Sequence, residues 1–307
     1  MRPELIQFEN DMPVKASVVN VDQYPFHWHD ALEVIFVLEG QVTVGMGSET
    51  HLLKQSDIAI INIDEIHRID TCGEDGKILL MQIDSAFCEW INPDYRYAFI
   101  YCCSPYHEAE APEKYKKLKE YIARLVFQLS KKPYKDDNKD VKACLKEMLI
   151  YMLYSFDYLR WGIGIEEFDK KQVERLKKMY EYMFNHPAEK PAFRDMAEGA
   201  DVTLCHLSHD IKKKFNQTFQ ELLHYSRCEH AAKLLLSTDK PITEISAECG
   251  FSDPKYLIKH FKLNHQYTPS QFRKMHRTDE KTLALQVRYH EDDLSDALEY
   301  LTPYISL

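Results

Sequence analysis

The chain has 307 residues, enough for about two domains of ordinary size. Its formal net charge of −10 argues against a protein that binds polyanions over its whole surface, so charge has to be read segment by segment. No apolar run approaches the ~18 residues of a membrane span, and the N-terminus lacks the apolar core of a signal peptide. The eight cysteines are scattered without a recurring zinc spacing, so we expect reduced thiols in a cytoplasmic protein without membrane contact.

The N-terminal half has the pattern of a β domain between residues 14 and 83. Short apolar runs alternate with turn signals, and Glu39-Gly40 predicts a hairpin turn between two of them. The predicted strands are residues 33–38, 41–45, 58–63 and 79–83. Many short strands at this spacing favour a small barrel or a sandwich.

Four polar side chains in this half form a candidate binding site. Side chains alternate between the two faces of a strand, so His27, His29 and Glu33 can point the same way if the strand is unbroken. His67 follows the next apolar run and can close the set from a neighbouring strand. Two or three imidazoles and a carboxylate suit a divalent transition metal. The alternative is a pocket in which these side chains hydrogen-bond a small ligand or one another.

These residues also have the spacing of a known motif: H-x-H at 27–29, Glu33 four residues on, Gly40 seven further and a later histidine. The pattern resembles the cupin motif, although Asp64-Glu-Ile-His67 stands where a Pro-x-Gly usually precedes the last histidine. Three aromatic residues lie beside the set, namely Tyr24, Phe26 and Trp28. They suit stacking against a sugar ring, or they are simply part of the barrel core.

The middle of the chain predicts two helices, residues 113–129 and 140–159, each with an apolar stripe at helical spacing. The second stripe consists of Val141, Leu145, Met148, Leu149, Met152, Leu153 and Phe156. A helix hairpin of this kind offers a natural dimer surface, and equally the two helices can simply cover the barrel. Trp161-Gly-Ile-Gly164 then breaks the second helix and predicts a hinge.

From about residue 168 the chain is helical and contains one unit used twice. Residues 192–207 and 241–257 each predict a short helix, a tight turn and a second helix. A connecting helix over residues 219–236 would hold the two units at a fixed separation. DNA requires such a separation because successive major grooves on one face lie about 34 Å apart. Gly250 supplies the turn of the second unit, and Asp201 stands at the corresponding place in the first.

Local charge supports contact with nucleic acid. From Cys205 to Arg277 there are twelve lysines and arginines against seven acidic residues, a net charge of +5. A basic segment in an acidic chain is the expected electrostatic footprint of DNA binding. Any single lysine here is explained as well by a solvated helix face, but the repeat and the charge together favour DNA.

The second unit reads Pro241-Ile-Thr-Glu-Ile-Ser-Ala-Glu-Cys-Gly-Phe-Ser-Asp-Pro-Lys-Tyr-Leu-Ile-Lys-His-Phe261, followed by Tyr267-Thr-Pro-Ser-Gln-Phe-Arg273. These segments resemble the AraC/XylS family of transcription regulators. The resemblance covers residues 172–275 directly, and the barrel and helix pair look like that family's sensing and dimerising half. Three positions depart from the family pattern: Gln266 and Asn216 replace a usual glycine, and Asp210 replaces an apolar residue. We therefore expect the first unit to bind more weakly or to read a different pattern.

The resemblance also implies which residues face DNA. The base-facing candidates are Thr203, Leu204, Cys205, His206 and His209 in the first unit, and Asp253, Lys255, Ile258 and Lys259 in the second. Lys259 can donate to guanine O6 or N7. Lys212, Lys262 and the Thr268 hydroxyl are expected to contact phosphates, which position a protein on DNA rather than specify sequence.

Thirty residues remain after Arg277, with a net charge of −5. Residues 293–301 predict a short amphipathic helix with Leu294, Leu298 and Leu301 on its apolar face. One hypothesis is that this tail folds back on the basic surface or on the sensing half and competes with DNA. The alternative is a helix packed on its own domain, or a loose tail.

We therefore expect an α+β multidomain protein with four parts. They are a cupin-like ligand-sensing domain (1–110), a helical dimerisation hairpin and linker (111–165), a DNA-binding domain with two helix-turn-helix units (166–277) and an acidic tail (278–307). The expected ligand site comprises Tyr24, Phe26, His27, Trp28, His29, Glu33 and His67. No cofactor is required, although His27, His29, Glu33 and His67 also suit a divalent transition metal.

The expected function is ligand-responsive regulation of transcription, as an activator of carbohydrate-utilisation genes with a sugar or oligosaccharide as effector. The expected partners are double-stranded DNA, RNA polymerase and a second copy of the chain, bound through the helix pair around 113–159. The alternative is a cupin-type metalloenzyme with a helical assembly domain. No base, nucleophile or arginine cluster accompanies the histidines, which argues against an enzyme.

Overall fold

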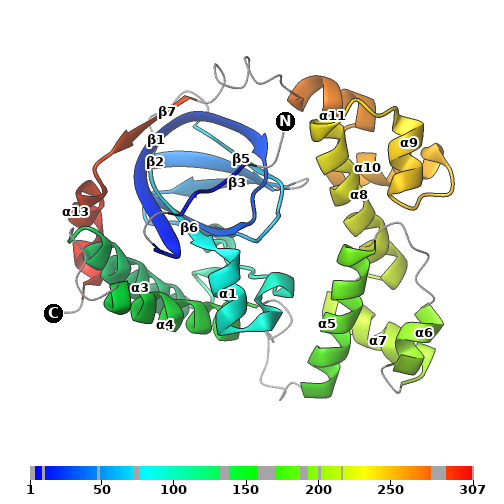
Figure 1. Cartoon of the computed structure of the whole chain (residues 1–307), viewed down its shortest axis with the longest axis horizontal. Coiled ribbons are helices and arrows are strands. Elements are labelled where there is room, and N and C mark those ends of the chain that lie inside the picture. The colour runs from blue at the N-terminus through cyan, green and yellow to red at the C-terminus, as the bar shows by residue number, and fades with distance from the viewer. Residues whose placement is uncertain are drawn as a thin grey trace. The chain divides into compact units, whose positions relative to one another are not determined.

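The computed structural model of the chain describes residues 4–8, 11–46, 49–71, 76–131, 138–157, 170–186, 193–199, 202–215, 217–277 and 288–305. These residues form two compact units (Figure 1). The barrel unit comprises residues 3–161 and 281–307, and the helical unit comprises residues 162–280 together with residues 1–2. Within the described ranges, no helix combines the length and the apolar character that crossing a membrane requires.

Antiparallel strands of the N-terminal half make the barrel. They are β1 (Val14–His27), β2 (Ala31–Met46), β3 (Glu49–Lys54), β4 (Ile58–Ile61), β5 (His67–Asp70) and β6 (Gly76–Asp84). The strand order is β3-β2-β5-β1-β6, and β6 also pairs with β2, so the sheet closes on itself as Figure 1 shows. β4 pairs with β2 beside this circuit.

The predicted hairpin turn at Glu39-Gly40 is wrong. β2 runs through these residues as one strand, and its register with β6 shifts between Val37 and Glu39. Gly40 has φ 72°, which suits a β-bulge as well as it suits a turn. The bulge bends β2, so that one part of the strand pairs with β6 and the other part with β3 and β5.

The two faces of the barrel wall belong to different cores. On β2, Val34 and Phe36 pack in a core with the helices, whereas Ile35 and Val37 belong to a separate core of strand residues. This alternation follows from the two-residue period of a strand. Glu33 has the parity of Ile35, so its carboxylate is directed into the barrel and is buried there.

Two long helices, α3 (Pro112–Leu129) and α4 (Lys139–Phe156), lie within a few residues of the predicted pair. All seven residues of the predicted α4 stripe are buried, in the same core as the outer face of β2. The apolar stripes therefore cover the barrel, and any dimer surface has to use the opposite faces. The shorter elements are α1 (Ser85–Ile91), η1 (Pro93–Tyr97) and α2 (Ser104–His107). The predicted hinge at Trp161–Gly164 lies outside the described residues.

The helical unit contains the predicted repeat. Its helices are α5 (Lys170–Asn185), α6 (Phe193–Gly199), α7 (Leu204–Phe215), α8 (Phe219–Ser237), α9 (Ile242–Glu248), α10 (Pro254–His265) and α11 (Pro269–His276). The pairs α6–α7 and α9–α10 are the two predicted helix-turn-helix units, and α8 is the predicted connector. Figure 1 shows α9, α10 and α11 gathered at one end of α8 and α5, α6 and α7 at the other.

Local chemistry sets the ends of these helices. The Asp253 side chain accepts from Lys255 N at 2.7 Å, and Thr203 Oγ1 accepts from His206 N at 3.1 Å, so each side chain caps the helix that follows it. Gly250 has φ 77°, as the predicted turn requires, whereas Asp201 lies outside the described residues. Gln266 adopts a left-handed φ of 62° where the family usually has glycine, at a cost of roughly 1 kcal/mol.

The acidic tail is part of the barrel unit. Its elements are β7 (Arg288–Asp292), η3 (Leu294–Asp296), α13 (Ala297–Leu301) and η4 (Thr302–Tyr304). β7 pairs antiparallel with β1, and Leu301 is buried in the core shared with α3 and α4. Asp292 lies 3.1 Å from Lys77 Nζ and accepts from Asn20 Nδ2 at 2.7 Å. The tail thus packs on the sensing half, and its strand β7 goes beyond what the sequence pattern predicted.

Candidate functional site

Three histidines and a glutamate meet inside the barrel. His27 ends β1, His29 follows it, Glu33 lies on β2 and His67 begins β5. The register of β1 and β5 shifts between Tyr24 and His27, and this bulge sets His27 opposite His67. Pairing between the strands therefore brings together all four residues of the predicted set.

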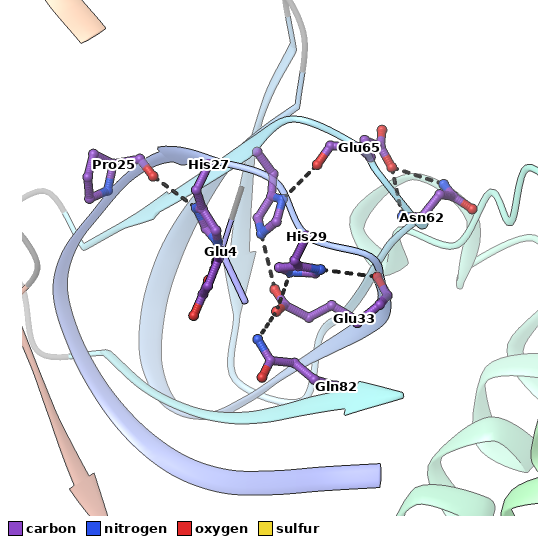
Figure 2. Close-up of polar contacts among 10 residues, drawn as sticks. Glu4, Pro25, His27, His29, Glu33, Asn62, Glu65 and Gln82 are labelled. Atoms are coloured by element: carbon purple, nitrogen blue, oxygen red, sulfur yellow. Dashed lines mark hydrogen bonds and ion pairs between the residues drawn. The ribbon is translucent and has the colours of Figure 1, made fainter. Parts of the chain in front are cut away.

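Short contacts join these side chains. His29 Nε2 lies 3.0 Å from Glu33 Oε2, and His67 Nε2 lies 3.3 Å from Glu33 Oε1. Gln82 on β6, the register partner of Glu33, donates from Nε2 to Glu33 Oε2 at 3.0 Å (Figure 2). The ring centroids of His27 and His67 are 4.0 Å apart. The side chains of His29, Glu33 and His67 are at most 1% exposed, so bulk water does not solvate their charges.

Backbone carbonyls fix the orientation of all three rings. The Nδ1 atoms of His27, His29 and His67 lie 2.9, 3.1 and 3.0 Å from the carbonyl oxygens of Pro25, Ala31 and Glu65, respectively. A carbonyl oxygen can only accept, so each Nδ1 carries the ring proton. In a neutral ring the Nε2 atom then presents a lone pair.

The turn before β5 holds the carbonyl that orients His67. Asn62 donates to Glu65 Oε2 from its backbone N at 2.9 Å and from Nδ2 at 3.0 Å. Ile100 N donates to Asn62 Oδ1 at 2.7 Å, and Asp64 has φ 63°. This turn stands where the cupin motif has Pro-x-Gly, and it positions the last histidine by side-chain hydrogen bonds instead.

Burial and the neighbouring charges act on this cluster in opposite directions. Burial raises the pKa of Glu33, but the contacts with His29 and His67 outweigh it and hold that pKa well below its usual range. Burial alone would lower the pKa of His29, yet the Glu33 carboxylate raises it above the ordinary value. For His27, burial and the adjacent His67 hold the pKa well below its usual range. Glu33 is therefore anionic and His27 neutral near pH 7.

The N-terminal segment adds a further carboxylate to the cluster. Glu4 N donates to the Trp28 carbonyl at 2.9 Å, and Glu4 Oε2 lies 3.5 Å from His27 Nε2. Burial raises the pKa of Glu4, while a hydrogen bond with Tyr24 opposes this. No pattern in the residues before β1 predicts this contact. Gln82, by contrast, could be found from its parity with Glu33 once β2 and β6 are paired.

A cavity of about 40 Å³ adjoins the cluster and has room for about three water molecules. Residues from five strands contribute to its lining, among them Tyr24, His27, Glu33, Gln82 and Glu291. Phe26 and Trp28 are buried and do not belong to this lining. The Arg68 guanidinium lies over the Phe26 ring, 5.4 Å from its centroid. Of the three aromatic candidates for stacking, Tyr24 reaches the cavity, because the bulge after it breaks the alternation along β1.

The second helix of each helix-turn-helix unit buries one face and exposes the other. Leu207 and Ile211 of α7, and Leu257 and Phe261 of α10, are at most 1% exposed. The predicted DNA-facing residues in and beside these helices are exposed: Thr203, Leu204, Cys205, His206, His209, Lys212, Lys255, Ile258, Lys259 and Lys262. Two further candidates are half-buried at helix N-caps, Asp253 before α10 and Thr268 before α11.

Asp210, which stands where the family pattern has an apolar residue, is buried in an ion pair. Its Oδ2 lies 2.9 Å from Nη2 of Arg175 on α5 and 3.5 Å from His206 Nε2. The Arg175 and Asp210 side chains are 12% and 7% exposed. Charge pairing therefore joins α5 to α7 where apolar packing was expected. No local pattern reveals Arg175, because its partner lies 35 positions away.

Several basic residues of the helical unit make internal contacts. Arg273 Nη2 donates to the Lys240 carbonyl at 2.6 Å, Lys240 Nζ lies 2.5 Å from Glu248, and Arg277 pairs with Asp239. The lysines of α10 remain exposed, namely Lys255, Lys259 and Lys262. The second unit thus offers a concentrated positive surface on its exposed helix face.

Comparison with known proteins matches both units to families. Residues 196–275 match a family described as a helix-turn-helix domain, and residues 19–81 match a family described as an AraC-like ligand binding domain. The chain is 21% identical to the HTH-type transcriptional regulator YdeC of Bacillus subtilis (strain 168) over 283 residues, 86% of this chain and 93% of that protein.

Two further similarities cover different extents of the chain. It is 33% identical over 79 residues to the lactose operon transcription activator of Staphylococcus xylosus, which is 26% of this chain and 28% of the activator. Among solved structures, ToxT from Vibrio cholerae aligns over 87% of this chain and all of its own, with 13% identity and a TM-score of 0.47.

Proposed function

Because this chain is an AraC-family helix-turn-helix transcriptional regulator with an AraC-like ligand-binding domain, we propose that it reads an operator with both helix-turn-helix units. The family is not enzymatic, so we do not retain the alternative of a cupin-type metalloenzyme. The observation that carries the proposal is the pair α7 and α10, each with one buried and one exposed face, joined through α8. Recognition helices held in this way suit neighbouring stretches of the major groove.

Within this interface the two units have different tasks. Base reading falls to Thr203, Leu204, Cys205, His206 and His209 on the first unit and to Asp253, Lys255, Ile258 and Lys259 on the second. Phosphate contacts fall to Lys212, Lys262 and Thr268. The second unit is the firmer anchor in this proposal, because α10 carries three exposed lysines, Lys255, Lys259 and Lys262. In the first unit His206 Nε2 lies 3.5 Å from Asp210 Oδ2, so this side chain is engaged within the unit.

The effector in this proposal is a sugar or short oligosaccharide, and the output is activation of carbohydrate-utilisation genes. The similarity to a lactose operon transcription activator supports this assignment. So does the cavity lining, in which Tyr24 offers a ring while Gln82 and Glu291 offer groups that hydrogen-bond hydroxyls.

The working form in this proposal is a homodimer that acts in the cytoplasm together with RNA polymerase. The inner stripes of α3 and α4 are used within the barrel unit, so dimerisation falls to their outer faces. Phe127, Ile150 and Tyr154 are exposed apolar side chains on these helices and supply such a surface. A dimer doubles the number of recognition helices and matches an operator with two half-sites.

Ligand control then operates as a population shift. The effector changes the fraction of dimers that can engage both half-sites only if it binds that arrangement more tightly than the other. An effector with equal affinity for both arrangements would leave operator binding unchanged.

Footprinting of the full-length protein on DNA upstream of its own gene tests the proposal. We expect protection of two half-sites, each covering two successive major grooves, and a change in occupancy with one member of a sugar panel. Alanine variants of Lys259 and His209 should each remove protection from one part of a half-site. Uniform protection of unrelated DNA with the same affinity would contradict sequence-specific binding.

A further inference from the structure

The histidine cluster of the barrel brings acceptor groups against one another. Each Nδ1 proton is directed at a backbone carbonyl, so the Nε2 atoms of neutral rings present lone pairs. The Glu33 carboxylate can only accept, yet its oxygens lie 3.0 Å from His29 Nε2 and 3.3 Å from His67 Nε2. Lone pairs at these distances repel unless a positive charge lies between them. A second proton on His29 would satisfy its contact with Glu33 Oε2, but it leaves His67 Nε2 and Glu33 Oε1 without a partner.

Unpartnered atoms converge at the same place. Glu33 Oε1, His67 Nε2 and Glu4 Oε2 are buried and have no hydrogen-bond partner among the described residues. Glu33 and His67 are at most 1% exposed, so water from the bulk does not satisfy them. Buried polar atoms in native proteins are nearly always paired, and exceptions call for a specific explanation.

We propose that the Nε2 atoms of His27, His29 and His67, together with the Glu33 carboxylate, bind one divalent first-row transition metal ion inside the barrel. One dication supplies positive charge to all four groups at once, whereas a single additional proton serves one pair. Three imidazoles with one carboxylate form a donor set that suits such ions in preference to calcium or magnesium.

The surroundings of the rings match a metal site. Histidines that bind metals typically donate their other ring N–H to a carbonyl or carboxylate, and all three rings do so here. One nitrogen of each ring lies within 4.8 Å of the others. In a tetrahedral site the ligand nitrogens are about 3.3 Å apart. The distances between the three ring nitrogens therefore have to shorten by about 1.5 Å at most.

The position of the site links it to the ligand cavity. His27 and Glu33 are part of the cavity lining, so an ion held by them faces the space assigned to the effector. Glu4, 3.5 Å from His27 Nε2, is the nearest additional carboxylate and can complete the coordination when no effector oxygen does. This link to the effector rests on the proposed function, whereas metal binding itself does not.

Metal binding can be measured on untagged, full-length protein that has been stripped with a chelator. We expect one Co²⁺ per chain, with the visible absorption bands of a low-coordinate site that includes nitrogen donors, and displacement by Zn²⁺. His67→Gln should weaken Co²⁺ affinity by roughly 100-fold or more. His51→Gln is the matched control, because His51 is also buried on the barrel beside a carboxylate, 3.4 Å from Glu49, but its ring contact among the described residues is with Tyr106 and not with an imidazole. It should leave the affinity unchanged.

X-ray absorption of the wild-type Zn²⁺ form covers the case in which His67→Gln fails to fold. A first shell of nitrogen and oxygen with imidazole scattering supports the proposal, whereas a sulfur shell would place the ion on cysteines and overturn it. The proposal also fails if the stripped protein binds neither ion, or if His67→Gln binds Co²⁺ as well as wild type does. Metal content and the footprint on DNA are separate measurements, so failure of the metal site and failure of operator binding remain distinguishable.

Discussion

Asp210→Asn is expected to destabilise the helical unit by about 3 kcal/mol. Asp210 pairs with Arg175 at 2.9 Å, and both side chains are nearly buried. Removal of one partner from a buried pair costs roughly 3–5 kcal/mol, because the other charge stays buried without compensation. The Arg175 and Asp210 side chains are still 12% and 7% exposed, which favours a destabilisation at the lower end of that range. A loss of this size reduces the folding equilibrium constant of the unit by about 100-fold.

Hydrogen exchange of peptides from α5 and α7, followed through a urea titration, measures this loss. Glu248→Gln is the control, because Lys240 and Glu248 form a pair whose side chains are each 36% exposed and whose removal should cost less than about 1 kcal/mol. Replacement of both Arg175 and Asp210 by leucine should recover most of the stability, since buried pairs can often be exchanged for apolar packing. If Asp210→Asn costs no more than Glu248→Gln, the Arg175–Asp210 pair does not hold α7 in place.

Three other variants test separate parts of the molecule. Lys259→Ala should weaken specific operator binding by about 1–3 kcal/mol and relax one base position, whereas Lys262→Ala should weaken binding evenly across sequences; binding to a library of operator variants separates the two effects. Burial and the adjacent His260 hold the pKa of His224 at about 4, against 6.5 ordinarily, so the unfolded chain takes up a proton that the folded chain does not. Stability of the helical unit should therefore be fully present above pH 6.5 and fall as pH drops towards 4, and His224→Phe should flatten this slope in urea melts; an unchanged slope would assign the pH dependence to other groups. Leu301→Ala should destabilise the barrel unit by about 2–5 kcal/mol in the same measurement, because Leu301 is fully buried against the helix pair, and a loss below 1 kcal/mol would mean that the tail is not part of that core.

The sequence pattern predicts the parts of the fold that depend on local periodicity. The stripes of α3 and α4, the two helix-turn-helix units and the alternation around Glu33 all follow from residue spacing, and the structure confirms them. The turn predicted at Glu39-Gly40 fails because a glycine with positive φ suits a bulge and a turn equally, and pairing with β6 decides between them. β7 consists of Arg-Tyr-His-Glu-Asp and has no apolar alternation, so its strand conformation depends on pairing with β1.

The candidate site also has some residues that the sequence predicts and others that only the structure shows. Parity along one unbroken strand predicts that His27, His29 and Glu33 lie together, but β1 ends at His27 and β2 begins at Ala31, so pairing between strands brings them to His67. Contacts from distant segments bring in Glu4, which no spacing rule connects to the histidines. A bulge, which the sequence does not mark, takes Phe26 and Trp28 out of the cavity lining and leaves Tyr24 in it.

The chain connects the helical unit to the barrel unit at both of its ends. α4 precedes the first connection and α13 follows the second, and residues of both helices are buried in one core with the outer face of β2. β7 is the first described element after α11; it pairs with β1, which carries His27, and Glu291 on β7 is part of the cavity lining. β7 therefore belongs both to the cavity lining and to the tail that follows the helical unit in the chain, whereas α4 packs on the outer face of β2 and is not part of that lining.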